Sequence, residues 1–473
     1  MDQSCAPLWE AIVEYANKKV ISFHTPGHKL RSGVFPHIDK ILGTSLWALD
    51  ASDEVEDITN NHSFKQVLKL AETLAGELFN SYAARFLING TSGGIHSMLL
   101  GLTGKIVIPR FSHQSVYGGL ILSEADPIYL AAKIDSEWNI PLPPTFEEIK
   151  QVLEHGKNIE TIFLTYPTYY GTTTELEKIL KLKKQHEVAI FVDEAHGSHF
   201  RFSPELPESA VDLKADLVVH STHKTLGTLT QSSLLHINNP DLEAKIDTAL
   251  TVLQSTSPSL ILLGVIDAVR RELALSGKAL VENAVRLGNY IRDRLKCIDG
   301  VKVAPSRITN DPTKILFNLN EIGLSGLEVE TRLRYDYNIQ VELSDYYNVL
   351  ALITIGDTEQ SVESFLAAVD DLVRRFSGNK PLPKLSVPYY LAIPQKVFSM
   401  RRAICSQSEM TTLSQAENRI AADFLIPYPP GVPVIVPGEV ISSDLIDYLK
   451  SCYKNGWEVR GMREENLMVI KEH

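Results

Sequence analysis

Cysteine is scarce in this chain, with 4 residues among 473. The four are scattered along the sequence, at Cys5, Cys297, Cys405 and Cys452. No Cys-x-x-Cys pair occurs, which argues against a disulfide framework and against a zinc site built from cysteines. This usage is typical of a reducing compartment, so we expect a cytoplasmic protein.

Long hydrophobic runs and an excess of basic residues are also lacking. The longest apolar stretch, Leu260–Val269, is well short of the ~20 residues that a membrane span needs. Met1–Glu10 has neither the basic start nor the apolar centre of a signal peptide. The formal net charge is -12, whereas a nucleic-acid-binding protein needs a basic face. We expect neither a membrane nor a nucleic-acid partner.

Short apolar runs alternate with amphipathic stretches between about residues 70 and 240. The expected strands are Lys105–Pro109, Thr161–Thr165, Ala189–Val192 and Leu217–Val219. The expected helices are Phe146–Glu154 and Glu175–His186, which have apolar positions at helical spacing. Nearly continuous apolar strands separated by such helices predict an α/β fold with a large, mostly parallel sheet that is covered on both faces.

A smaller α/β unit is expected after a connecting helix at Ala279–Leu295. Its expected strands are Val301–Ala304, Lys314–Leu319, Val341–Leu343 and Leu350–Ile355, and its expected helices are Leu327–Leu333 and Val362–Phe376. The composition of Gly378–Pro388 indicates a linker, followed by a Pro-rich stretch at Ile426–Pro433 and a helix near Leu445–Tyr453. The expected domain ranges are an N-terminal segment at 1–70, a large domain at 71–290, a small α/β domain at 291–380 and a C-terminal domain at 388–473.

A Gly-rich turn, Asn89–Gly94, precedes the helix-compatible run Ile95–Leu100. Small residues at the start of a helix expose backbone N–H groups, and Thr91 and Ser92 add hydroxyl donors, so a phosphate group fits there. Most Gly-rich turns before helices are only turns, and this stretch alone is weak support for a phosphate site.

An acid, Asp193, stands at the end of the apolar run Ala189–Val192. An aspartate in this place commonly caps a turn. Its carboxylate could instead pair with the protonated nitrogen of a pyridine ring and keep that ring an electron sink. Ala195 would then be the small residue under a flat ring, and His196 could hydrogen-bond the cofactor or a neighbouring group.

A lysine, Lys224, follows the next expected strand in a turn with Ser221 and His223. Most lysines are solvated surface residues. A lysine that forms a Schiff base must lose its proton, and partial burial lowers its pKa. The order along the chain, from phosphate turn to strand-end acid to strand-end lysine, favours a pyridoxal-phosphate (PLP) lysine.

The histidines allow two other interpretations. His196, His199, His220 and His223 do not share a helix face, and neither a His-Glu-x-x-His motif nor a cysteine ligand accompanies them, so we expect no metal site. His113, just after the strand Lys105–Pro109, could stack on the open face of a cofactor ring.

Seven stretches in the same order resemble the Orn/Lys/Arg decarboxylase family, from about residue 20 to 440. They are FHTPGHK (Phe23–Lys29), NGTSGG (Asn89–Gly94), PTYYG (Pro167–Gly171), DEAHGSHF (Asp193–Phe200), STHKTLGTLTQSS (Ser221–Ser233), STSPS (Ser255–Ser259) and PYPPGVPVIVPGE (Pro427–Glu439). The resemblance implies a PLP-dependent enzyme with the aspartate-aminotransferase fold (fold type I). The chain is similar to short members that lack a receiver-like N-terminal domain.

The resemblance implies a role for each candidate residue. Lys224 forms the Schiff base and Asp193 pairs with the pyridine nitrogen. The other implied cofactor contacts are His113 and Ala195 on the two ring faces, His196, and the phosphate ligands Thr91, Ser92, Ser221 and His223. The family's active site lies at a dimer interface, so a homodimer or larger homo-oligomer is expected, with Phe23–Lys29 and Ser255–Ser259 reaching the partner subunit's site.

The implied activity is decarboxylation of a basic L-amino acid in polyamine-related metabolism, with arginine favoured over lysine and ornithine. His223 or Lys224 would return a proton to Cα, and His196 is a further catalytic candidate. Glu342 and Glu439 are candidates for binding the distal cation of the substrate, although both could be surface acids. Fold alone leaves another PLP reaction open, such as transamination or elimination, and intact Lys224 and Asp193 argue against an inactive homologue.

The sequence departs from the family pattern at two positions. Gln114 stands where relatives often carry lysine, and Asn418 replaces a common glycine. Neither position touches the expected chemistry.

Overall fold

The structure, a computed structural model, describes residues 1–473 except 56–57, 60–61, 384–391, 429–431 and 472–473. The expected linker Gly378–Pro388 and the Pro-rich stretch lie partly outside the described residues. The chain divides into two units, one of Met1–Met98 with Phe191–Glu282 and one of Leu99–Ile190 with Asn283–His473. The four domain ranges expected from the sequence stay a prediction.

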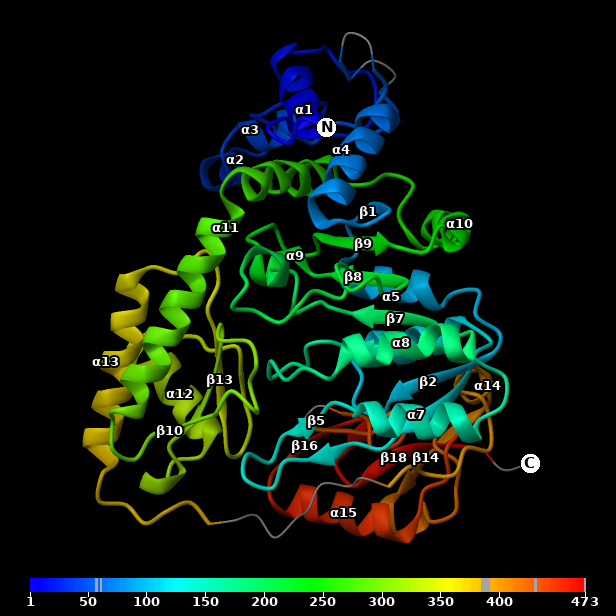
Figure 1. Cartoon of the computed structure of the whole chain (residues 1–473), viewed down its shortest axis with the longest axis vertical. Helices are drawn as coiled ribbons and strands as arrows, with labels where there is room; N and C mark the ends of the chain where they lie inside the picture. Colours follow the sequence, from blue (N-terminus) through cyan, green and yellow to red (C-terminus); the bar gives the residue numbers. More distant parts are fainter. Residues whose placement is uncertain (56–57, 60–61, 384–391, 429–431, 472–473) are drawn as a thin grey trace. The chain divides into compact units, whose positions relative to one another are not determined.

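The first unit contains four neighbouring strands in the order β1-β9-β8-β7 (Figure 1). Their bounds are β1 Ala83–Leu87, β7 Ala189–Asp193, β8 Leu217–His220 and β9 Ser233–Ile237. Strands β7 and β8 run parallel, whereas β9 is antiparallel to both β8 and β1. Every residue of β8 and β9 is buried, as expected of strands covered on both faces.

Helices precede, connect and follow these strands along the chain of the first unit. Their bounds are α1 Pro7–Asn17, α2 Pro36–Leu42, α3 Ser45–Leu49, α4 Phe64–Phe79, α5 Gly90–Leu99, α9 Thr222–Thr225 and α10 Glu243–Leu253, with 3-10 turns at Phe200–Phe202 and Pro240–Leu242. Gly94 lets α5 approach closely, because a Cβ atom there would lie 2.7 Å from side-chain atoms of both Leu87 and Val219. Helix α5 therefore lies directly on β1 and β8.

A helix of 37 residues, α11 Leu260–Lys296, begins in the first unit and ends in the second. The sequence predicted only its second half, Ala279–Leu295. Its first residues are the apolar stretch Leu260–Val269, and no helix among the described residues is long and apolar enough to cross a membrane.

The second unit contains three parallel strands in the order β6-β2-β3. Their bounds are β2 Lys105–Pro109, β3 Asp126–Leu130 and β6 Ile159–Thr165, and a hairpin pairs β4 Lys133–Ile134 with β5 Pro141–Leu142. The helices between them are α6 Gln114–Leu122, α7 Phe146–His155 and α8 Leu176–His186. Helix α7 begins at a capping box in which Thr145 and Glu148 bond each other's backbone N–H groups, as its sequence favours.

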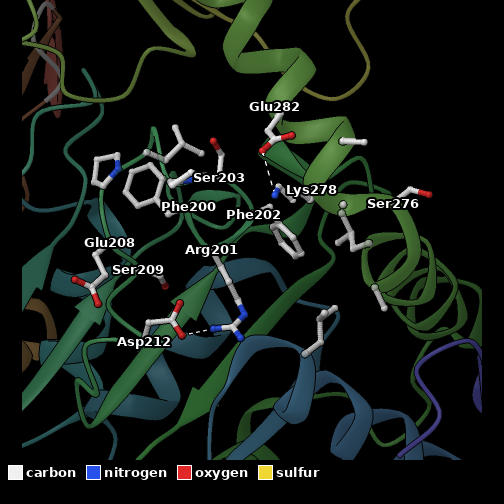
Figure 2. Close-up of a pocket in the computed structure, with 18 of the residues that line it drawn as sticks. Phe200, Arg201, Phe202, Ser203, Glu208, Ser209, Asp212, Ser276, Lys278 and Glu282 are labelled. Carbon is white, nitrogen blue, oxygen red and sulfur yellow. Dashed lines mark hydrogen bonds and ion pairs between the residues drawn. The ribbon is translucent and has the colours of Figure 1, made fainter.

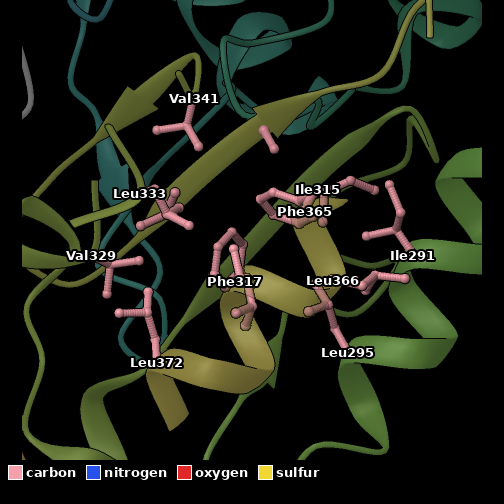
Figure 3. Close-up of a cluster of buried hydrophobic side chains, with 14 of the residues drawn as sticks. Ile291, Leu295, Ile315, Phe317, Val329, Leu333, Val341, Phe365, Leu366 and Leu372 are labelled. Carbon is pink, nitrogen blue, oxygen red and sulfur yellow. The ribbon is translucent and has the colours of Figure 1, made fainter. Parts of the chain in front are cut away.

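A four-stranded antiparallel sheet follows in the same unit, in the order β10-β11-β13-β12. The bounds are β10 Lys302–Val303, β11 Lys314–Asn318, β12 Leu343–Ser344 and β13 Val349–Leu352, with helices α12 Gly326–Tyr337 and α13 Glu359–Phe376 and a 3-10 turn at Asn320–Ile322. Buried side chains of β11, α11 and α13 form one core, in which the rings of Phe317 and Phe365 meet edge to face at 5.7 Å (Figure 3).

The last part of the second unit has a separate core of buried aliphatic and aromatic side chains. Its elements are α14 Met400–Cys405, β14 Ser408–Thr412, a 3-10 turn at Leu413–Gln415, β15 Ile426–Tyr428, α15 Ser443–Lys454, β16 Glu458–Arg460, β17 Met462–Arg463 and β18 Asn466–Ile470. Asn418, which replaces a glycine of the family, has φ +62°. Asparagine tolerates this left-handed conformation better than other non-glycine residues, so the substitution fits its place.

Candidate functional site

Two neighbouring parallel strands of the first unit end in the residues that carry the expected chemistry. Strand β7 ends at Asp193, and β8 ends at His220, one residue before Ser221. Lys224 lies in the single helical turn α9, which Ser221 precedes. The Nζ atom of Lys224 lies 2.9 Å from Nε2 of His196. The structure therefore brings together the lysine and one histidine that the sequence had placed 28 positions apart.

Asp193 is a buried acid, with 4% of its surface exposed. Its Oδ1 atom accepts a hydrogen bond of 3.0 Å from the N–H of Ala195, which is also buried. This contact is the turn cap that the sequence allowed as the alternative role. It uses one carboxylate oxygen, so the cap and a role toward a ring nitrogen are compatible.

The turn after β8 is fixed by bonds to the start of β9. The Nδ1 atom of His223 lies 2.9 Å from the carbonyl oxygen of Ser232, and the Oγ of Ser221 lies 3.3 Å from the His223 ring. Thr222 donates to the same Ser232 carbonyl at 3.0 Å. A carbonyl can only accept, so Nδ1 of His223 carries a proton in this contact.

The Gly-rich turn lies at the beginning of α5. The helix begins at Gly90, so Thr91 and Ser92 occupy its first turn rather than a loop before it. Gly90 has φ +65°, which favours glycine, and its N–H donates to the carbonyl of Gln231 at 2.8 Å. Because Ser232 follows Gln231, one short segment joins the Gly-rich turn to the turn that carries Lys224.

His113 belongs to the second unit, where it caps the N-terminus of α6. Its side chain is exposed, and its Nδ1 lies 2.7 Å from the hydroxyl of Ser115. A ring held by its Nδ1 has a defined orientation, but stacking of His113 on a cofactor stays a prediction.

Glu342, the first candidate for substrate binding, is exposed in the second unit. Its Oε1 accepts a hydrogen bond of 2.6 Å from the hydroxyl of Tyr169, in the motif Pro167–Gly171. Burial, followed by the charge of Glu342, raises the pKa of Tyr169. The phenol therefore stays protonated and holds the carboxylate in place.

Glu439, the second candidate, is fully buried in an ion pair within the second unit. Its two oxygens accept hydrogen bonds of 2.8 and 2.7 Å from the guanidinium of Arg110, and the N–H of Val436 adds a third at 2.8 Å. The hydroxyl of Tyr117 donates to the carbonyl of Arg110, and burial raises the pKa of that phenol to about 12. Both carboxylate oxygens of Glu439 already have partners in the chain, which argues against a role in substrate binding.

A buried polar cluster, which the sequence did not predict, lies beside these strand ends. Glu194 accepts hydrogen bonds from the N–H of Ala210 and the hydroxyl of Ser209, both at 2.8 Å. Its Oε2 lies 2.6 Å from Nε2 of His220, whose Nδ1 lies 3.1 Å from Nε2 of His236. The only available signal was the position of Glu194 and His220 next to Asp193 and Ser221.

The chain matches two models of one protein family. Residues 6–313 match the model described as Orn/Lys/Arg decarboxylase, major domain, and residues 386–466 match its C-terminal domain. An arginine decarboxylase of Bacillus anthracis is 36% identical, covering 100% of this chain and 99% of that protein. An arginine decarboxylase of Bacillus subtilis (strain 168) is 33% identical, covering 100% and 98%.

Solved structures share the fold at low sequence identity. The constitutive lysine decarboxylase of E. coli aligns with a TM-score of 0.84 and 19% identity, covering 99% of this chain and 82% of that one. A serine palmitoyltransferase of Sphingomonas wittichii aligns with a TM-score of 0.54 and 17% identity, covering 78% and 84%. The predicted fold class, α/β of the aspartate-aminotransferase type, is confirmed.

Proposed function

The chain belongs to the Orn/Lys/Arg decarboxylase family, and we propose that it uses PLP to convert arginine into the corresponding amine and CO₂. The observation that carries the proposal is the contact of 2.9 Å between Lys224 and His196 beside the buried Asp193. Arginine is preferred because full-length relatives at 33% and 36% identity are named arginine decarboxylase. Relatives named lysine decarboxylase are 22–23% identical.

The chemistry of the donor set fits PLP. PLP needs a primary amine to bind its aldehyde and a buried carboxylate to pair with its pyridine nitrogen. It also needs a helix N-terminus to bind its phosphate. All three belong to the first unit, at Lys224, Asp193 and the first turn of α5. Among the described residues, the buried hydroxyls of Thr225 and Ser233 have no hydrogen-bond partner, so donors remain available near the lysine turn.

When bound, PLP supplies an electron sink for the electrons that carbon dioxide leaves behind. Asp193 would hold the proton on the pyridine nitrogen. Lys224 would hold the cofactor covalently between turnovers, with His196 as the acceptor or donor of its proton. Thr91, Ser92, Ser221 and His223 would bind the phosphate, while Ala195 and His113 would cover the two faces of the ring.

Loss of CO₂ leaves a position on Cα that a proton must fill. Lys224 and His223 are the two candidates, as the sequence indicated. The imidazole of His223 already donates from Nδ1 to the Ser232 carbonyl, which leaves Nε2 as the nitrogen that can exchange a proton. The amine of Lys224 can exchange its proton with His196.

Selection of the substrate would depend on Glu342. An exposed carboxylate held by the Tyr169 hydroxyl presents two oxygens, and a guanidinium binds such a pair through two parallel hydrogen bonds. The longer, planar cation of arginine uses this geometry better than the ammonium of lysine or ornithine does.

We also propose a cytoplasmic homodimer or larger homo-oligomer. Phe23 is 95% exposed at the start of the motif Phe23–Lys29, and Ile21 is 71% exposed. Apolar side chains so exposed next to a family motif support contact with a partner subunit.

The test is to supply the purified protein with PLP and to incubate it in three separate reactions, one with arginine, one with lysine and one with ornithine. We expect CO₂ and amine from arginine at the highest rate, and none from the Lys224→Ala variant. Lys278 lies on α11 and its side chain is highly exposed. Lys278→Ala is therefore the matched control, and it should decarboxylate arginine at the wild-type rate. Absence of CO₂ with all three substrates would contradict the proposal.

A further inference from the structure

A chain of hydrogen-bonded side chains, which we call the Glu194 network, links Glu194, His220 and His236 beside the ends of three strands. All three residues have 0% exposure. The network continues from Nδ1 of His236 to the hydroxyl of Ser81 at 3.2 Å, and from Glu194 to the hydroxyl of Ser209 at 2.8 Å. It therefore crosses β7, β8 and β9 and ties each to its neighbour through side chains.

The Glu194 network and Asp193 lie on opposite faces of these strands. Successive side chains of a strand point to opposite faces, and the N–H of Glu194 continues the ladder by donating to the Val219 carbonyl at 3.0 Å. Asp193 is in register with Val219, which contacts Gly94 of α5. The side chain of Asp193 therefore lies on the face of the strands that α5 covers, and the Glu194 network lies on the opposite face.

Register places His236 on the same face as His220. His236 is opposite Val218 in the antiparallel pair of β9 and β8, and Val218 is two residues before His220. This cross-strand arrangement explains why the two imidazole rings, with centroids 4.5 Å apart, can bond.

Burial keeps the network uncharged. It raises the pKa of Glu194, lowers that of His220 to about 3 and lowers that of His236. A protonated Glu194 can donate to Nε2 of His220, which donates from Nδ1 to His236, which in turn donates to Ser81. Every polar atom along this path then has a hydrogen-bond partner, and the network needs no buried charge.

Aromatic rings close the network from solvent. The ring of Phe79 lies 5.4 Å from the His220 ring and 5.0 Å from the His236 ring, and Phe202 meets Phe79 edge to face at 5.7 Å. Beyond them is a groove of about 820 Å³, where Ser209 and Phe202 lie in the wall near the Arg201–Asp212 ion pair (Figure 2). The charges of Arg201 and Asp212, together with the titratable His199, act on the network from its surroundings.

We propose that the Glu194 network positions the cofactor-binding residues on the opposite face of the strands. Glu194 is covalently next to Asp193, and His220 is next to Ser221, whose turn carries Lys224. A bond of 2.6 Å between Glu194 and His220 fixes the two strand ends relative to each other. The inference rests on the proposed function, because it assigns the network to the binding of PLP by these residues.

The test compares a substitution that removes the hydrogen bonds with one that keeps them. In Glu194→Met the side chain has similar size but cannot donate or accept, whereas the amide of Glu194→Gln can accept from Ala210 and donate to His220 and Ser209. We expect Glu194→Met to raise the dissociation constant of PLP about tenfold. Glu194→Gln should recover the affinity to within about threefold of wild type.

The readout is the absorbance of bound PLP as holoenzyme is diluted, at a temperature where circular dichroism shows each variant folded. Glu72→Met is the matched control, since Glu72 is a buried acid of the same unit that accepts a bond from Phe86 at the edge strand β1. It should lower the melting temperature without changing the PLP dissociation constant, which separates positioning from stability.

A second pair keeps the test valid if Glu194→Met does not fold. Ser209→Ala removes one bond to Glu194, and Ser203→Ala removes a buried hydroxyl from the same groove wall. The first should weaken PLP binding about threefold and the second should not. Wild-type affinity in a folded Glu194→Met variant, or in Ser209→Ala where Glu194→Met does not fold, would overturn the inference. Equal loss of affinity in Glu194→Gln and Glu194→Met would overturn it as well. A wild-type protein that binds no PLP would instead refute the proposed function and the inference with it.

Discussion

Removing the carboxylate of Glu439 is expected to destabilise the chain strongly. The guanidinium of Arg110 bonds both oxygens of Glu439, and only 6% and 1% of the two side chains are exposed. In Glu439→Ala this guanidinium would remain buried without its counter-charge. Breaking one partner of such a buried pair typically costs about 3–5 kcal/mol of unfolding free energy.

The assay is equilibrium urea unfolding followed by circular dichroism. The variants measured together are Glu439→Ala, Glu439→Leu, Arg110→Met and the double variant Arg110→Met with Glu439→Leu. Replacing both partners by apolar residues of similar size leaves no buried charge, so the double variant should lose less stability than either single variant. The exposed pair of Lys302 and Glu321, at 3.2 Å in the same unit, is the control and should contribute no more than about 1 kcal/mol.

A loss below about 1 kcal/mol in Glu439→Ala would refute this reasoning, because that is the range of an exposed pair. Unchanged stability together with a raised KM for arginine would restore the role in substrate binding that the sequence had suggested for Glu439.

Two further predictions concern other acids. Glu342→Gln should raise the KM for arginine roughly tenfold with a smaller effect on kcat, because it removes the negative charge that we propose binds the distal cation of the substrate. Steady-state kinetics measures this, with the exposed Glu321→Gln as control, and an unchanged KM would contradict a role of Glu342 in substrate binding. Glu72 has its pKa raised to about 7 by burial, so its contribution to stability is present below the ordinary pKa of 4.5 and is lost as the pH rises to about 7. Glu72→Gln should therefore flatten the fall in unfolding free energy across that interval, and an identical pH profile for variant and wild type would contradict the assignment.

Local patterns were sufficient to predict most of the secondary structure. The bounds of β2 are those expected, and β7 and β8 each extend one residue beyond their expected ends to include Asp193 and His220. Runs of buried apolar residues define such strands because both faces are covered. The start of α11 was missed because its apolar residues do not show the one-sided pattern that identifies an amphipathic helix.

Contacts between distant residues were beyond the reach of sequence patterns. Arg110 and Glu439 are 329 residues apart, and their pairing depends on how the C-terminal segment folds back. The bond between His220 and His236 depends on the register of β8 and β9, which a shift of one residue would destroy. The sequence did not predict the contact of Lys224 with His196 itself, but it placed both residues just after the ends of expected strands, where functional residues gather.

The most direct test of the account is to locate PLP on the chain. Borohydride reduction of the holoenzyme would fix the cofactor to the amine that holds it, and peptide mass spectrometry would identify the modified residue. We predict a single pyridoxyl group on Lys224, absent when arginine is present in excess during reduction. Modification of another lysine, or none at all, would contradict the central claim.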